Sequence, residues 1–440
     1  MADDKVGVLG EPKVGHNPVE HPGGGIRYGR IRQYLRMVTC AIYFAGGILW
    51  IFLTQCLGSP LYFINKTAYY TWMARTKANF GVLVTTLTQW WSPTVVTVTG
   101  NRDVQDQIRL TRDGRLELDF PERIVLIANH QLYSDWLYLW WVAYTAKMHS
   151  FMYIILKESL KSVPVIGQGM LFFGFIFLAR KWEQDKPRFE HRLNKLSKGE
   201  AAKDPMWLLI FPEGTNASEN GRKTSAKYAQ KIGIQDLKHT LLPRSTGLAF
   251  CLRNLEKSVE WMYDCTVAYE GVPEGKFGQD YFTLFSTYFE GRPPKSVNMH
   301  FRKFRISDIP IHDAKQFDLW LRERWVEKDD LMEYYNQHGR FPEDESKVNG
   351  TLTDENSEDG GVRKRVIKSG VNGNSNQWKG PIETEVKLES TWEVFSAFST
   401  LLTAGLLVHI IRTIWKLVFK ITMAAAEVAG PVGDLPVADI

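Results

Sequence analysis

Cysteine is scarce in this sequence, and the familiar metal and nucleotide motifs are missing. The 440 residues include four cysteines, and no two of them form a CxxC pair. A disulfide framework or a zinc knuckle is therefore not supported. The histidines show no HExxH spacing, and the chain has neither a GxxxxGKS/T phosphate loop nor a complete dinucleotide fingerprint. We expect no metal site, no bound cofactor and a reducing compartment.

Net charge is also low, whereas aromatic residues are abundant. Lys and Arg total 54 and Asp and Glu total 49, which leaves a net charge of +5. That excess is too small over this length to indicate nucleic-acid binding. Aromatic residues make up 13% of the chain, and such chains often contact bilayer interfaces or apolar ligands.

An uncharged segment near the N-terminus predicts a membrane anchor. Met37–Ile64 runs for 28 residues without a formal charge, and a span needs about 20 apolar residues. Four arginines between positions 27 and 36 precede it. By the positive-inside rule, residues 1–36 form a basic tail on the cytosolic side.

Glycine and proline positions in this segment permit a hairpin, so the number of membrane crossings stays open. Breaks at Gly46-Gly47 and at Gly58-Ser59-Pro60 allow the chain to return to the cytosol. Phe80–Thr99 is expected to be a helix followed by a strand and to supply the return limb. We assign residues 37–93 to membrane-anchoring helices or a hairpin.

The C-terminal end contains a second apolar segment. Val394–Ile411 has no formal charge, and Arg412, Lys416 and Lys420 follow at a spacing of four. Because each such charge costs about 2.5–3.5 kcal/mol at the bilayer centre, we place this helix at the membrane interface. Residues 391–425 are assigned to a C-terminal membrane helix and 426–440 to a tail, although a buried soluble helix explains this segment equally well.

Between the two ends the pattern is α/β. Short apolar runs that alternate with helical patterns predict a mixed, mostly parallel sheet flanked by helices, with the N- and C-terminal helices embedded in the membrane. Residues 94–290 form the main domain, and 291–344 add a strand and an amphipathic helix. Residues 345–390 are expected to be a disordered linker, because apolar content is low from Glu345 to about Gly380. The expected strands are 94–99, 123–129, 151–156, 175–178, 207–211, 266–269 and 297–306.

A histidine and an aspartate stand five residues apart directly after one apolar strand. A carboxylate at Asp135 can orient the His130 imidazole and stabilise its protonated form. No GxSxG elbow occurs, so the attacking group is expected to be a substrate hydroxyl directed at an activated acyl group. Taken alone, the HxxxxD spacing is weak evidence, because His130 can equally cap a helix or fill the core.

A glycine-containing turn follows the strand 207–211. Gly214 lets the backbone approach an anion, and Thr215 and Asn216 offer hydrogen-bond donors. Glu213 is expected to accept hydroxyl groups or to pair with a cation, not to bind phosphate directly.

Two other segments supply cations. Arg180 and Lys181 follow the strand 175–178, where an arginine fork suits phosphate, although a solvated charge pair explains them equally well in isolation. Pro243 and Arg244 precede a helix that Ser or Thr caps, which is another position for an anion. In isolation, an ordinary cap with a surface arginine is the simpler interpretation.

In their order and spacing, four blocks resemble the PlsC-like glycerolipid acyltransferase superfamily. The blocks are NHQLYSDW, FIFLARKW, IFPEGTN and LLPRSTG, within about Thr94 to Gly271. Downstream, VNMHFR, WLRERWVEKDDL and GRFP resemble the eukaryotic branch of lysocardiolipin, lysophosphatidylinositol and 1-acylglycerol-3-phosphate acyltransferases. The resemblance implies that 94–290 is the acyltransferase catalytic domain.

The resemblance also implies roles for the site residues. His130 would be the base and Asp135 its partner. Arg180, with the turn Glu213-Gly214-Thr215 and with Pro243-Arg244, would hold the acceptor phosphate and the acyl donor, fatty acyl-CoA, which is a cosubstrate. The implied location is the endoplasmic reticulum membrane, with the catalytic domain in the cytosol.

We therefore expect a membrane enzyme that esterifies the free hydroxyl of a lysophospholipid. The acceptor would be lysophosphatidylinositol, lysocardiolipin or lysophosphatidic acid. Trp136–Trp141 and Val163–Phe173 would provide the apolar side of the site, and core packing explains them equally well. A lipid acyl hydrolase and a non-catalytic membrane lipid-binding protein are the alternatives.

Overall fold

One large sheet organises the chain, for which a computed structural model describes residues 21–343 and 380–429. The sheet has eight strands in the order β10-β1-β9-β8-β4-β7-β5-β6. Among the described residues, neighbouring strands are parallel except in the pairs β8–β9 and β1–β10, which confirms the expected mixed, mostly parallel sheet. The strands are β1 Val95–Gly100, β4 Arg123–Ala128, β5 Met152–Lys157, β6 Ile176–Leu178, β7 Met206–Ile210, β8 Trp261–Tyr269, β9 Ser296–Arg305 and β10 Ile382–Glu385, beside the separate hairpin of β2 Ile108–Leu110 and β3 Leu116–Leu118.

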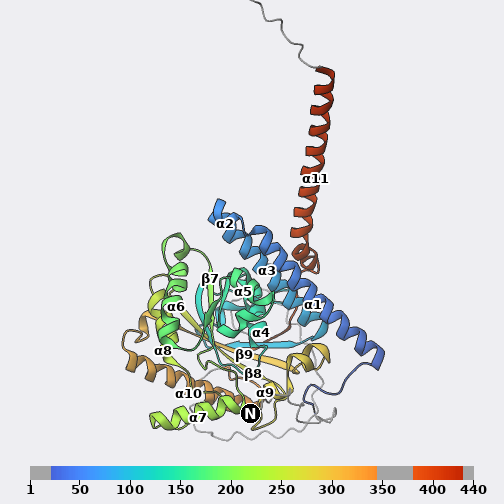
Figure 1. The fold of residues 1–440 in the computed structure, drawn as a ribbon. Helices are drawn as coiled ribbons and strands as arrows, with labels where there is room; N and C mark the ends of the chain where they lie inside the picture. The colour runs from blue at the N-terminus through green and yellow to red at the C-terminus, as the bar shows by residue number, and fades with distance from the viewer. Residues whose placement is uncertain (1–20, 344–379, 430–440) are drawn as a thin grey trace, which may run out of the picture.

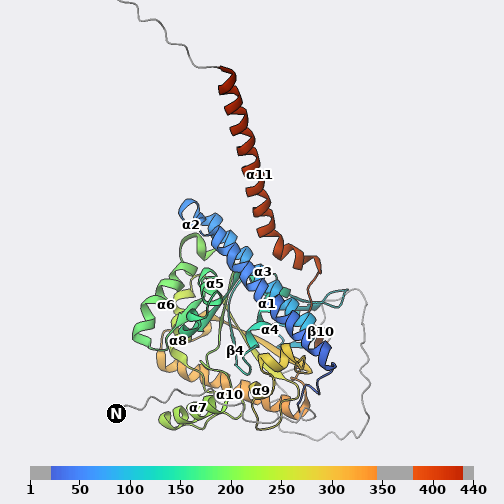
Figure 2. The same ribbon diagram turned by 45° about the vertical axis from the view of Figure 1, so that its right-hand side comes forward.

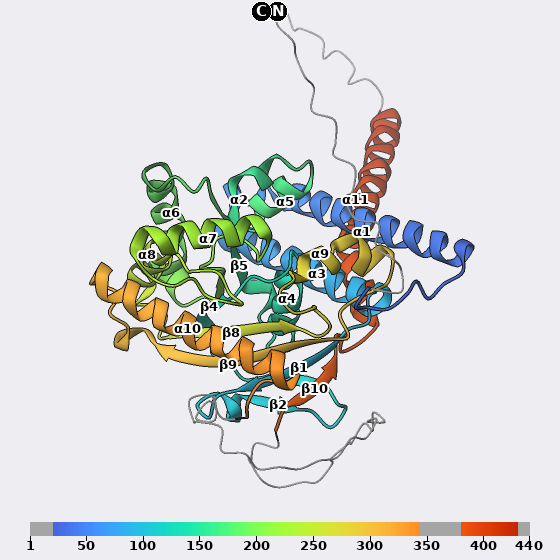
Figure 3. The same cartoon turned by 90° about the horizontal axis from the view of Figure 1, so that it is seen from below.

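Helices cover both faces of this sheet (Figure 1). Alternate side chains of β4 point to opposite faces: Leu126 joins the core that contains α4, whereas Val125 joins the core beneath α6, α8 and α10. Figure 3 shows α10 running across β8 and β9. The helices are α1 Arg30–Gly58, α2 Leu61–Ile64, α3 Lys66–Trp91, α4 Asp135–Thr145, α5 Ile166–Phe172, α6 Trp182–Ser197, α7 Glu219–Ile232, α8 Ser245–Leu255, α9 Gly278–Tyr281, α10 Ala314–His338 and α11 Trp392–Ala429, with short turns η3 Glu158–Ser162 and η5 Phe285–Phe289.

The N-terminal segment forms a helical hairpin in which α3 returns alongside α1 (Figure 2). The chain reverses after Gly58, as expected. The expected break at Gly46-Gly47 is wrong, because α1 continues through it. A Cβ atom at Gly47 would stand 2.4 Å from the Leu83 side chain of α3. The glycine therefore serves close helix packing and not chain reversal.

The N-terminal end of this hairpin is tied to the α/β domain. Arg36 donates to the carbonyl oxygens of Tyr288 and Phe289, each at 2.8 Å, at the end of η5. Within the described residues, Arg30–Ile64 has the length and composition of a membrane span. The orientation set by the arginines stays a prediction.

The C-terminal elements correct the extent of the linker. Residues 344–379 lie outside the described residues, but β10, within the range 345–390, pairs with β1. The expectation of a linker is therefore wrong for residues 382–385. The start of α11 is docked by a 2.9 Å bond from Asn79 Nδ2 to the Ala397 carbonyl, and the helix then projects away from the domain (Figure 1). Its membrane-interface position stays a prediction.

Candidate active site

The end of β4 carries the predicted base. The buried side chain of Asn129 bonds to both backbone groups of Val267 on β8, at 2.8 and 2.9 Å, and so fixes the strand exit. His130 follows, and Asp135 opens α4. His130 Nδ1 lies 2.8 Å from Asp135 Oδ2. The structure thus brings the two predicted catalytic residues together.

Asp135 is held rigidly beneath the imidazole. It accepts bonds from the backbone N–H of Gln131 at 2.7 Å and of Leu132 at 3.0 Å, and from the Tyr269 hydroxyl. Burial raises the pKa of Tyr269 well above its usual range, so this hydroxyl stays protonated and donates. The Asp135 side chain is fully buried, whereas 19% of His130 stays exposed.

This arrangement orients one imidazole nitrogen for chemistry. Because Asp135 engages Nδ1, Nε2 is left to accept a proton. The imidazole stacks on the Phe211 ring with centroids 4.3 Å apart. Such a pair can act as a general base on a bound hydroxyl group.

The predicted glycine turn lies against the histidine. Gly214 adopts φ +72°, which glycine tolerates and most residues do not. The Ala217 N–H donates to the His130 carbonyl at 2.6 Å. Asn216 is buried and donates to Gln279 of α9, whereas Thr215 is partly exposed.

Glu213 is the most perturbed carboxyl of the site. Only 4% of the residue is exposed, and burial raises its pKa to about 8. Its Oε1 accepts the indole N–H of Trp325 at 3.3 Å, and its Oε2 has no partner within the described residues. At neutral pH the Glu213 carboxyl is mostly protonated, and it supports the turn from inside the protein.

Arg180 also reaches the turn. Its guanidinium donates to the Gly214 carbonyl, and its own φ is +65°. Asp185 holds this strained backbone by accepting the N–H groups of Ala179 at 2.8 Å and Lys181 at 3.0 Å. Lys181 is exposed at the start of α6.

The fourth predicted segment adjoins the same turn. The Arg244 N–H donates to the Pro212 carbonyl at 2.7 Å, and Pro243 is buried. The Arg244 guanidinium lies 4.0 Å from the centre of the Tyr228 ring. All four predicted segments therefore meet at the end of the sheet where β4, β6 and β7 finish.

Comparison with known proteins agrees with this geometry. The acyltransferase family model matches residues 95–270, and a model for the acyltransferase C-terminus matches 287–356. A 2-acyl-1-lysophosphatidylinositol acyltransferase of Saccharomyces cerevisiae is 36% identical over 350 residues, covering 72% of this chain and 88% of the relative. The chain belongs to the acyltransferase family.

Other relatives of this acyltransferase carry related names. An uncharacterised acyltransferase of Schizosaccharomyces pombe is 42% identical over 312 residues, covering 71% of this chain and 87% of the relative. Lysocardiolipin acyltransferase 1 of Gallus gallus is 32% identical over 286 residues, covering 64% of this chain and 68% of the relative. The resemblance to PlsC-like lysophospholipid acyltransferases is confirmed.

Several residues of the acyltransferase site were missed by the sequence reasoning. Asn129, Tyr269, Asp185 and Trp325 all position other groups. Tyr269 was recognisable, because it ends a strand expected to lie in the same sheet. Trp325 was not, because 112 residues separate it from Glu213. Trp140 and Trp141 of α4 are buried in the core, which supports core packing for that helix.

Proposed function

We propose that this protein is an acyl-CoA-dependent lysophospholipid acyltransferase with His130 as its general base. The observation that carries the proposal is the His130–Asp135 pair, in which one ring nitrogen is anchored and the other is left to accept a proton. Nε2 takes the proton from the free hydroxyl of the lysophospholipid. The alkoxide oxygen attacks the thioester carbonyl, the C–S bond breaks, and the proton passes from His130 to the departing CoA thiolate.

The basic side chains around this pair supply the binding groups. Arg180 and Lys181, at the start of α6, together with Arg244, would neutralise phosphate groups of the acceptor and of acyl-CoA. The Gly214 and Thr215 turn would bring backbone and hydroxyl donors to the same anions. Glu213, Asn216 and Pro243 are buried, so their role in this proposal is to shape the turn.

The acceptor is proposed to be lysophosphatidylinositol, lysocardiolipin or lysophosphatidic acid. The name of the Saccharomyces cerevisiae relative favours the first of these, and that of the Gallus gallus relative favours the second. We place the protein in the endoplasmic reticulum membrane with the catalytic domain in the cytosol. A panel of lysolipids, assayed with acyl-CoA on purified membranes, tests this ranking.

His130→Ala tests the mechanism. We expect acyl transfer to fall by about 10²–10⁴, the usual contribution of a general base, while membrane association is kept. His312→Ala is the control, because His312 pairs with Glu256 at an exposed position. Undiminished turnover in His130→Ala would overturn the role of His130 as the base. Absence of acyl transfer in the native protein as well would favour the non-catalytic lipid-binding alternative. Release of free fatty acid in place of acyl transfer would favour the hydrolase.

A further inference from the structure

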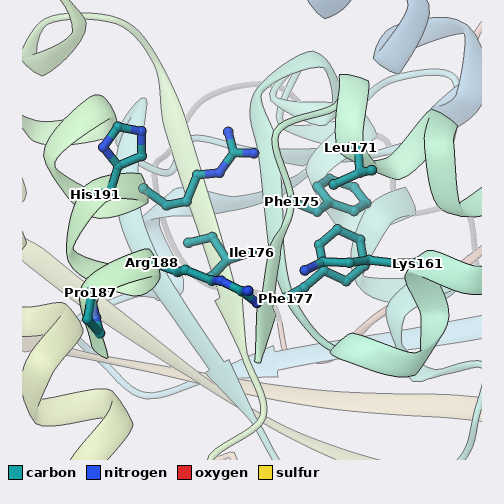
Figure 4. A pocket seen from close by; sticks show the side chains of 9 residues that line it. Lys161, Leu171, Phe175, Ile176, Phe177, Pro187, Arg188 and His191 are labelled. Carbon is teal, nitrogen blue, oxygen red and sulfur yellow. The ribbon is translucent and has the colours of Figure 1, made fainter. Parts of the chain in front are cut away.

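A pocket outside the candidate active site lies beyond the edge strand β6. None of the predicted catalytic or anion-binding residues lines this pocket, although Arg180 follows β6 closely. In the sheet, β6 is three strands away from β4, whose end carries His130. The pocket has a volume of about 360 Å³. Phe177 of β6, Phe175 just before this strand and Leu171 of α5 form its apolar side, as Figure 4 shows.

The opposite side of this pocket carries two arginines, and a lysine reaches toward them from the apolar side. Arg188 and Arg192 come from α6, and Lys161 from η3 faces Arg188 across the opening (Figure 4). Lys161 and Arg188 share one carboxylate oxygen of Glu158, at 3.0 and 2.7 Å. Arg192 has no carboxylate partner in the part of the chain that the structure describes. Three cations thus face one carboxylate, so the pocket attracts an anion.

Arg192 also links this pocket to the membrane hairpin. Its charge acts on the phenols of Tyr69 and Tyr70 on α3, so it lies near them. Phenols do not neutralise a guanidinium at physiological pH, because their usual pKa is about 10. The positive charge of Arg192 therefore stays available beside the hairpin.

The pocket lies where the hairpin meets the α/β domain. Helix α5 is bound to α1 through a 3.3 Å bond from Gln55 Nε2 to the Gly169 carbonyl and through the Phe52 and Phe172 rings. At the tip of the hairpin, Phe63 is 89% exposed. Leu171, at the pocket rim, is 40% exposed. Exposed apolar side chains of this kind suit the lipid interface.

We propose that this pocket binds an anionic membrane phospholipid at a site separate from the acyl-transfer site. Arg188, Arg192 and Lys161 hold the phosphate, and the first part of an acyl chain lies on Phe175 and Phe177. A lipid matches both sides of the pocket, whereas a free phosphate ion matches only the basic side. The bound lipid would keep the sheet edge against the membrane.

The test measures lipids retained by the full-length protein in mild detergent, using native mass spectrometry. The protein is offered phosphatidylserine and phosphatidylcholine in equal amounts. We expect the native protein to retain one phosphatidylserine in preference. Arg188→Gln with Arg192→Gln should lower this retention about thirtyfold, since each basic residue near an anionic lipid contributes about a kilocalorie per mole.

A matched control separates a specific site from general charge. Lys186→Gln with Lys198→Gln also removes two positive charges, one from α6 and one from its C-cap. Neither residue lines the pocket. Retention should be unchanged in this control and also in His130→Ala. Equal losses in both charge pairs, or no preference for phosphatidylserine in the native protein, would overturn the proposal.

Two further outcomes would assign the pocket to another ligand. Complete displacement of the lipid by excess inorganic phosphate would indicate a soluble-anion site. A higher KM for acyl-CoA in the Arg188 and Arg192 variant, with lipid retention unchanged, would indicate a subsite for the acyl donor. Either result would reject the separate lipid site, and neither depends on whether His130 is the base.

Discussion

The indole of Trp325 donates its N–H to the buried carboxyl of Glu213, with Nε1 and Oε1 3.3 Å apart. Trp325 lies in the middle of α10, in the C-terminal extension, and Glu213 lies in the turn against His130. The extension therefore helps to hold the turn of the candidate active site.

Trp325→Phe tests this support. The substitution removes one donor to a buried acceptor, which costs about 1 kcal/mol and corresponds to about fivefold in rate if the turn shifts. We expect kcat to fall by that factor and KM to change less, as measured in a steady-state acyl-transfer assay.

Trp320→Phe on the same helix is the control for a general loss of packing, because Trp320 contacts Phe304 and Phe317 away from the turn. If both variants lower kcat equally, Trp325 has only a packing role. The same holds if Trp325→Phe lowers the melting temperature while kcat is kept.

Glu213 should make stability depend on pH. Its pKa is raised from 4.5 to about 8 by burial, so the folded state binds a proton that the unfolded state releases between these values. The free energy of unfolding should therefore fall as pH rises from 4.5 to 8, by up to about 1.4 kcal/mol per pH unit.

Glu213→Gln removes this titration and keeps an acceptor for Trp325. The apparent melting temperature, followed by tryptophan fluorescence, should change less between pH 5 and 8 in the variant than in the native protein. Parallel profiles for the two proteins would show that Glu213 is charged when folded.

Asp185→Ala should weaken substrate binding through Arg180. Two backbone N–H groups lose their acceptor, and the strained conformation at Arg180 is no longer held. We expect KM for a phosphate-bearing substrate to rise about fivefold, the equivalent of one hydrogen bond, with a smaller effect on kcat.

Glu183→Ala, an exposed acid in the same first turn of α6, is the control. A purely structural role for Asp185 would instead lower the amount of folded protein and leave KM unchanged.

Lys328 should be essential for stability. Its buried ammonium bonds to Asp264 at 2.6 Å and to the Cys265 carbonyl at 2.9 Å, and Arg302 lies on the other oxygen of Asp264. Lys328→Met removes the cation that bonds to Oδ1 of the buried Asp264. We therefore expect the free energy of unfolding, measured in urea, to fall by about 3–5 kcal/mol.

Arg305→Gln breaks the pair with Glu260, where both side chains are more than half exposed, and should have little effect. Similar losses in the Lys328 and Arg305 variants would mean that burial of the Asp264 cluster does not matter for stability.

Local patterns were sufficient for much of the fold. The apolar run 123–129 and the alternation of strands and helices predicted the sheet, because strand and helix periods differ. The His130–Asp135 pair was also accessible, since a turn between a strand end and a helix start can bring two side chains five residues apart into contact. The packing role of Gly47 was not accessible, because it depends on Leu83 of another helix.

The chain's order of residues specified the candidate base, its carboxylate partner and the four segments that contain or surround them, because these are short-range features of strand ends. Folding decided how they work together. Tyr269 and Trp325 acquired their roles by bonding to Asp135 and Glu213, which are distant in sequence. Asp185 acquired its role by accepting backbone N–H groups of a nearby turn. β10 likewise joined the sheet through the free edge of β1. Such contacts arise from burial and hydrogen bonding across the whole domain, which no local pattern encodes.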